Sequence, residues 1–117
     1  MPAPTRTLEN LWDLEMRILY DEAVKYCHYR ATYFLQMVVD HGGLEAARIL
    51  LHKEGISEGL ATLWQYGRLD LTMEARMFQR DETGARKWEP LFTSEEFDIA
   101  RARLVQLEYA PALDGSL

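Results

Sequence analysis

Apolar residues in the first quarter of the chain recur at intervals of three and four, which predicts a long amphipathic helix. From Leu8 onward, charged residues fill most of the intervening positions, and the apolar set comprises Leu11, Trp12, Met16, Leu19, Ala23, Tyr26 and Cys27. This spacing places one apolar stripe on a helix of 3.6 residues per turn. Thr7 is the expected N-cap, because its hydroxyl can accept a hydrogen bond from a free backbone N–H.

A second apolar block, residues 33–39, runs toward the glycine pair Gly42 and Gly43. The block is apolar on most sides, which predicts a helix in the centre of a bundle rather than at its edge. A glycine after His41 suits the left-handed position that often follows a helix, because glycine adopts it without steric cost.

Short helical patterns follow, separated by glycines and capping residues. A third helix runs from Leu44 to Leu51, and Ser57 is the expected N-cap of a fourth that continues until Gly67. A fifth is capped by Asp70 or Thr72 and directs Ala75, Met77 and Phe78 inward.

The last third combines one polar loop with one strongly signalled helix. Residues 80–90 are predicted to form the loop, with Trp88 holding its end to the body of the protein. Thr93 and Glu96 have the spacing of a capping box, which predicts a final helix from Ser94 to about residue 108.

These patterns define the expected fold class as all-α, a single compact bundle of about five to six helices. The domain is expected to span residues 7–109, with flexible tails at residues 1–6 and 110–117. The chain has 117 residues, is 48% apolar and holds three tryptophans. It is therefore long enough and hydrophobic enough to bury one core.

The net charge indicates which binding partners are disfavoured, and the cysteine content indicates the cellular compartment. The formal net charge is −6, and its field repels phosphate backbones and anionic membranes, so nucleic acid is a disfavoured partner. Cys27 is the sole cysteine, which excludes an intrachain disulfide and fits a reducing compartment. Without an apolar signal segment or membrane span in the sequence, we expect a cytoplasmic protein that does not contact a membrane.

Candidate catalytic and metal-binding residues lack the spacing that such chemistry uses. His28, His41 and His52 are not three or four residues apart, so no two share a helical face as ligands. Cys27 is expected to be a small buried hydrophobe. The sequence therefore predicts no catalytic residue, cofactor or metal site; an enzyme would need His28, His41 or Asp40 to converge in a pocket between helices.

Trp64, Tyr66, Arg68 and Asp70 are the candidate partner-contact residues. They lie on or beside a tight turn between two short helices, and Trp, Tyr and Arg are enriched at interface hot spots. The alternative is purely structural: Arg68 would close the carbonyls of the fourth helix, and Asp70 would cap the fifth.

Residues from the third helix to Arg68 also resemble the helix-turn-helix of phage-repressor-type domains. Ile56-Ser57 and Trp64-Gln65-Tyr66-Gly67-Arg68 are similar to the start and the end of that fold's recognition helix. The resemblance implies DNA binding, but residues 58–66 carry no Arg or Lys that could reach guanine or phosphate.

Four further motifs resemble a family of short, uncharacterised bacterial proteins. They are Tyr33-Phe34-Leu35-Gln36-Met37, Gly42-Gly43-Leu44-Glu45-Ala46-Ala47, Gly59-Leu60-Ala61-Thr62-Leu63-Trp64 and the run from Gly67 to Glu74. The resemblance covers about two-thirds of the chain, residues 29–104, and implies a compact helical unit without a known activity.

The sequence therefore predicts a small non-enzymatic helical module of bacterial or phage origin, of the accessory, inhibitor or adaptor type. Its expected partner is another protein or a second copy of itself. A helix-turn-helix transcriptional regulator is the alternative.

Overall fold

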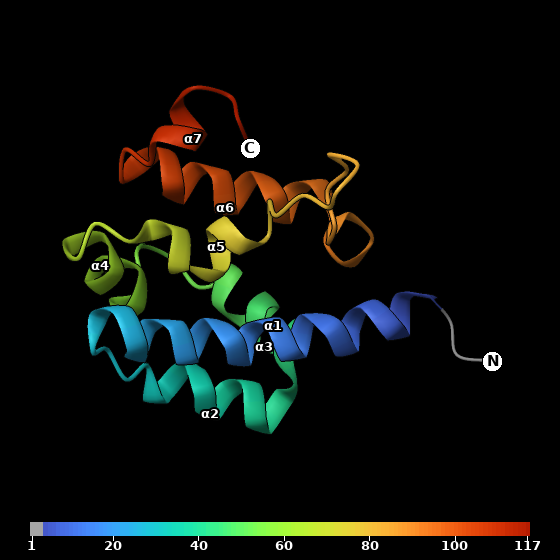
Figure 1. The fold of residues 1–117 in the computed structure, drawn as a ribbon, viewed down its shortest axis with the longest axis horizontal. Helices are drawn as coiled ribbons and strands as arrows, with labels where there is room; N and C mark the ends of the chain where they lie inside the picture. Colours follow the sequence, from blue (N-terminus) through green and yellow to red (C-terminus); the bar gives the residue numbers. More distant parts are fainter. Residues whose placement is uncertain (1–3) are drawn as a thin grey trace.

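The regular elements of the protein are helices, arranged as one bundle (Figure 1). The computed structural model describes residues 4–117, and the side chains of residues 7–117. In chain order the elements are α1 (Pro4–Cys27), α2 (Thr32–His41), α3 (Gly43–Leu51), α4 (Glu58–Gln65), the 3-10 turn η1 (Leu69–Leu71), α5 (Met73–Arg76), the 3-10 turn η2 (Glu89–Leu91), α6 (Ser94–Gln106) and α7 (Ala110–Leu113). Across residues 4–117 there is no β-strand, and the predicted all-α bundle is confirmed.

Two long helices frame the molecule. Figure 1 shows α1 along one side with α2 beside it, and α6 along the opposite side with α7 and the C-terminus outside it. The short helix α5 lies between the two sides, and α4 lies near the C-terminal end of α1. The core therefore forms where α1 faces α5, α6 and the loop that joins α5 to α6.

Both ends of the predicted domain differ from the sequence-based expectation. Helix α1 begins at Pro4, three residues before Thr7, so Thr7 lies inside the helix and is not its N-cap. The part of the expected N-terminal tail formed by residues 1–3 lies outside the described residues. The expected C-terminal tail contains α7, and the Arg86 guanidinium donates a hydrogen bond of 3.0 Å to the carbonyl of Leu117.

Helix α2 lies at the edge of the bundle, and the prediction that it is central is wrong. Only Met37 and Val38 are buried, whereas Tyr33 and Val39 are exposed. The apolar content of the block misled the prediction because apolar atoms also make up much of an ordinary protein surface.

The glycine pair between α2 and α3 has two separate structural causes. Gly42 has φ +82° and ψ 159°, so the positive φ is confirmed, although ψ is extended rather than left-handed helical. That region of backbone space is open essentially to glycine alone. At Gly43 a Cβ atom would stand 2.7 Å from the Cα of Asp13, so α1 and α3 cross in near contact. The Asp13 carboxylate accepts a 2.8 Å hydrogen bond from the Gly43 N–H at this crossing.

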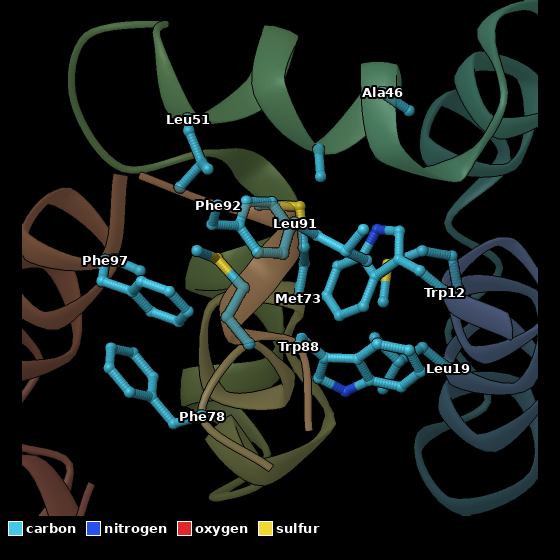
Figure 2. Close-up of a cluster of buried hydrophobic side chains, with 14 of the residues drawn as sticks. Trp12, Leu19, Ala46, Leu51, Met73, Phe78, Trp88, Leu91, Phe92 and Phe97 are labelled. Carbon is cyan, nitrogen blue, oxygen red and sulfur yellow. The ribbon is translucent and has the colours of Figure 1, made fainter. Parts of the chain in front are cut away.

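Aromatic side chains form the centre of the core (Figure 2). The Trp12 ring on α1 packs edge-on against Trp88 and Phe92, with ring centroids 5.2 and 5.1 Å apart. Phe92 meets Phe97 of α6 at 5.8 Å, and Phe97 meets Phe78 at 5.4 Å. The contacts among Trp12, Trp88, Phe92 and Phe97 have edge-to-face geometry, which adds to the free energy gained from area burial. Trp88 is fully buried, which confirms that it holds the end of the polar loop to the body.

Buried and half-buried ion pairs attach α5 to its neighbours. The Arg76 guanidinium reaches Glu15 and Glu22 of α1 at 2.8 and 2.9 Å. On the other side of α5, Arg103 of α6 reaches the buried carboxylate of Glu74 at 3.2 Å. These contacts position a helix of only four residues that could not be stable alone.

The helix caps follow the sequence closely. Ser57 caps α4, Thr72 caps α5, and the Thr93–Glu96 capping box at the start of α6 has both of its hydrogen bonds. No helix in residues 4–117 combines the length and the apolar character needed to cross a membrane.

Candidate interaction site

Backbone hydrogen bonds close the C-terminal end of α4. The Gly67 N–H donates to the Trp64 carbonyl and the Arg68 N–H donates to the Leu63 carbonyl, each at 2.9 Å. With Gly67 at φ +69°, these two bonds form a Schellman motif, in which a left-handed glycine reverses the chain. The motif satisfies two terminal carbonyls of α4 through the backbone itself.

Arg68 and Asp70 form a two-point ion pair across the turn that follows. The Arg68 Nε and Nη2 atoms donate to the two Asp70 carboxylate oxygens, each at 3.0 Å. These bonds lower the pKa of Asp70 below its usual value. Leu69 and Leu71 alternate with the charged residues and are buried, so they anchor the turn while Arg68 and Asp70 face outward.

Helix capping does not account for Arg68 and Asp70. Backbone N–H groups close the end of α4, as described above, and the Thr72 hydroxyl accepts the capping bond from the Ala75 N–H at 3.1 Å. The structural alternative, in which Arg68 closes α4 and Asp70 caps α5, is therefore wrong. The Asp70 carboxylate instead accepts hydrogen bonds from Arg68. Of the two candidate N-caps that the sequence offered for α5, Asp70 and Thr72, the structure uses Thr72.

Trp64 and Tyr66 stand beside this turn with about half of each residue open to solvent, 50% and 55% respectively. Exposed apolar side chains that gather on one surface can mark an interaction site. We call Trp64, Tyr66, Arg68 and Asp70, together with Tyr26 introduced below, the contact patch.

Tyr26 of α1 also belongs to the contact patch, although it is not among the contact residues predicted from the sequence. The guanidinium carbon of Arg68 lies 5.1 Å from the centroid of the Tyr26 ring, and Tyr26 is 51% exposed. The apolar pattern of the first helix predicts Tyr26 on the buried stripe, and this prediction is wrong. The buried positions at this end of α1 are Ala23 and Cys27, four residues apart, and a residue adjacent to Cys27 points about 100° away.

The histidines do not converge on a site. His28 lies in the connection before α2 and His41 is the last residue of α2, a helix of ten residues that is about 15 Å long. His52 caps the end of α3 and lies 3.4 Å from a carboxylate oxygen of Glu96. Within the described part of the chain, no group of three or more His, Cys, Asp or Glu could hold a metal ion. Cys27 is buried, as expected, and is not disulfide-bonded.

The segment that resembles a helix-turn-helix differs from that motif in its connection. Residues 52–57 separate α3 from α4, whereas the motif joins its helices through a turn of about three to four residues. The exposed positions of α4 include Glu58, Trp64 and Gln65, none of which carries a positive charge.

Comparisons with known proteins add no further constraint. No family model matches the chain, and neither a curated protein nor a solved structure gives a match. The resemblance to short bacterial helical proteins and the weaker one to phage repressors therefore stay predictions.

Proposed function

We propose that the protein is a non-enzymatic interaction module that binds a partner protein, or a second copy of itself, through the contact patch. The observation that supports this most strongly is the two-point Arg68–Asp70 pair displayed outward, next to exposed aromatics, without a capping role. Trp, Tyr and Arg are the residue types most enriched at interface hot spots.

Rigidity supports the proposal further. Gly67, the Schellman hydrogen bonds and the buried Leu69 and Leu71 fix the backbone of the turn before any partner arrives. A preformed surface loses little conformational entropy on binding, so more of the contact free energy appears as affinity. The Arg68 guanidinium also contacts Tyr26 and Asp70, which favour one position of this side chain.

DNA binding is supported less well than protein binding. Contacts to phosphate supply most of the affinity of DNA-binding proteins and require Lys or Arg on the docking face. Helix α4 has neither, the net charge is −6, and the arginine next to it is already paired with Asp70.

The variant Tyr66→Ala/Arg68→Ala tests the proposal. We expect partner capture from cells to fall by about thirtyfold or more, as for the loss of one hot spot, because both substitutions remove preformed contacts. The melting temperature should stay nearly unchanged, because both side chains are solvent-exposed and neither caps a helix. Affinity capture with quantitative mass spectrometry, beside thermal unfolding, measures both effects.

The matched control is Leu14→Ala/Arg17→Ala on α1. Leu14 is exposed, and Arg17 forms an exposed ion pair with Asp13 at 2.9 Å, so this variant removes similar groups outside the contact patch. Capture should persist in the control. Equal loss of capture in both variants, or a parallel fall in melting temperature for Tyr66→Ala/Arg68→Ala, would mean that the turn only supports the fold.

A further inference from the structure

A cavity of about 330 Å³ opens among the helices. Residues from α1 to α6 line it, and most of its wall is apolar, including Leu19, Ala23, Phe34, Leu60, Leu63 and Met73. Its size lies at the lower end of the range for small-molecule sites, which are concave, mostly apolar and carry a few polar groups. None of the five contact-patch residues lines it.

The deepest charged groups of the cavity already satisfy each other. Glu74 and Arg103 line it, and both are buried. Their side chains pair at 3.2 Å, and Arg103 also donates to the carbonyls of Leu51 and Lys53. A ligand charge placed here would have to displace these bonds, so the interior favours an uncharged, apolar group.

The mouth of the cavity carries a cation that has a neutral partner. Lys53 and Tyr33 both line the cavity and are exposed, and the Lys53 ammonium donates to the Tyr33 hydroxyl at 2.7 Å. Across the described residues, Lys53 forms no salt bridge. An ammonium group has three N–H donors, so Lys53 retains the capacity to bind an anion.

Glu58 is the other charged group at the mouth. It is exposed and occupies the first position of α4, where the positive end of the helix dipole offsets its charge. Burial, and then the charge of Glu58, raise the pKa of the neighbouring Tyr29, so this hydroxyl stays neutral. The mouth therefore has one cation, Lys53, one anion, Glu58, and the hydroxyls of Tyr29 and Tyr33 as further hydrogen-bonding groups.

We propose that this cavity binds a small amphiphilic monocarboxylate of the medium-chain fatty-acid class. The apolar chain fills the space between α1 and α4, and the carboxylate pairs with Lys53 and the Tyr33 hydroxyl at the mouth. This inference does not depend on the contact patch, because the two surfaces use different residues.

Titration calorimetry with decanoate below its micelle concentration tests the proposal. We expect one decanoate per chain, and Lys53→Met should weaken its binding by about fivefold, the upper end for the loss of one solvent-exposed ion pair. Decanol should bind wild type and Lys53→Met equally, since it lacks the carboxylate. Decylammonium should bind more weakly than decanoate, because its ammonium group would lie beside the Lys53 ammonium in the position proposed for the carboxylate.

Gly59 lines the cavity, and Gly59→Leu is the variant designed to fill it. A Cβ atom at Gly59 meets only the Tyr29 hydroxyl, at an ordinary contact distance of 3.5 Å, and leucine favours helix more than glycine does. The melting temperature should therefore not fall, while decanoate and decanol binding are both lost. Unchanged decanoate binding in Gly59→Leu, no binding to wild type, or decylammonium binding as tight as that of decanoate would overturn the proposal.

Discussion

Replacing Trp12 with alanine is expected to lower the free energy of unfolding by about 3–5 kcal/mol, the range for large aromatic truncations in cores. Trp12 is fully buried, and its ring is the meeting point of α1 with Trp88 and Phe92. Its indole N–H also donates to the Gly43 carbonyl at 3.1 Å, at the point where α1 crosses α3. Truncation would leave a cavity at the centre of the aromatic cluster, and urea unfolding followed by circular dichroism measures the loss.

Trp64→Ala is the matched control for this prediction. It removes the same side chain from a position that is 50% exposed, so less buried apolar area is lost and the free energy of unfolding should fall by clearly less than in Trp12→Ala. Similar losses from Trp12→Ala and Trp64→Ala would contradict the aromatic core. A large loss of stability in Trp12→Ala with a small loss in Trp64→Ala would show that Trp12 stabilises the fold, whereas Trp64, which we assign to binding, does not.

Replacing Arg103 with methionine is expected to cost about 3–5 kcal/mol at neutral pH, because the buried Glu74 carboxylate would lose its counter-ion. The guanidinium bonds Glu74 Oε2 at 3.2 Å and the Leu51 carbonyl at 2.9 Å, and it also bonds the Lys53 carbonyl. Arg103 thereby joins α6 to α5 and to the end of α3. Methionine has a similar length and no charge, so the loss reports on these bonds rather than on volume.

The cost of Arg103→Met should depend on pH. Burial raises the pKa of Glu74 above its ordinary value of 4.5, and Arg103 partly offsets that rise. Without Arg103 the pKa rises further, so the folded protein binds a proton that the unfolded chain has released. Its stability then falls as pH rises above 4.5, and the deficit relative to wild type narrows as pH falls toward 4.5.

Arg103→Met/Glu74→Gln is the control that isolates the unpaired charge. The double variant leaves no Glu74 carboxylate to be buried without a partner. Its free energy of unfolding at neutral pH should therefore exceed that of Arg103→Met by about 1 kcal/mol or more, and it should lack the added pH dependence. A double variant as unstable as the single one would assign the loss to the carbonyl contacts of Arg103 instead.

Local signals predicted most of the helix boundaries. Ser57, Thr72 and the Thr93–Glu96 box cap their helices through short-range hydrogen bonds that depend on neighbouring residues alone. Gly67 likewise ends α4 because a left-handed residue is needed there whatever surrounds it. Such features are readable in the sequence because the chemistry that causes them spans only a few residues.

Packing between distant segments was not readable in the same way. Helix α2 has enough apolar residues for a central place, but the molecule covers it on one side only. The Glu74–Arg103 pair joins residues 29 positions apart, and the cavity needs six helices to close it. Without knowledge of which helices meet, no pattern along the chain could identify these partners.

The candidate contact residues were predicted in part. Trp64, Tyr66, Arg68 and Asp70 stood out because aromatic and charged residues gather beside a glycine turn. Tyr26 lies 42 positions before Arg68, and its contact depends on how α4 docks against the end of α1. The sequence held one indication that Tyr26 is exposed: Ala23 and Cys27 are four residues apart and define the buried face of α1, and Tyr26 does not lie on that face.

Site-specific photo-crosslinking from position 66 tests the central claim most directly. A benzophenone amino acid in place of Tyr66, activated in living cells, should give one discrete crosslinked species whose added mass identifies a partner protein or a second copy of the chain. The same group in place of Val39, an exposed residue of α2 outside the contact patch, should give none. No crosslink from position 66, or the same species in equal yield from both positions, would contradict the assignment of the contact patch.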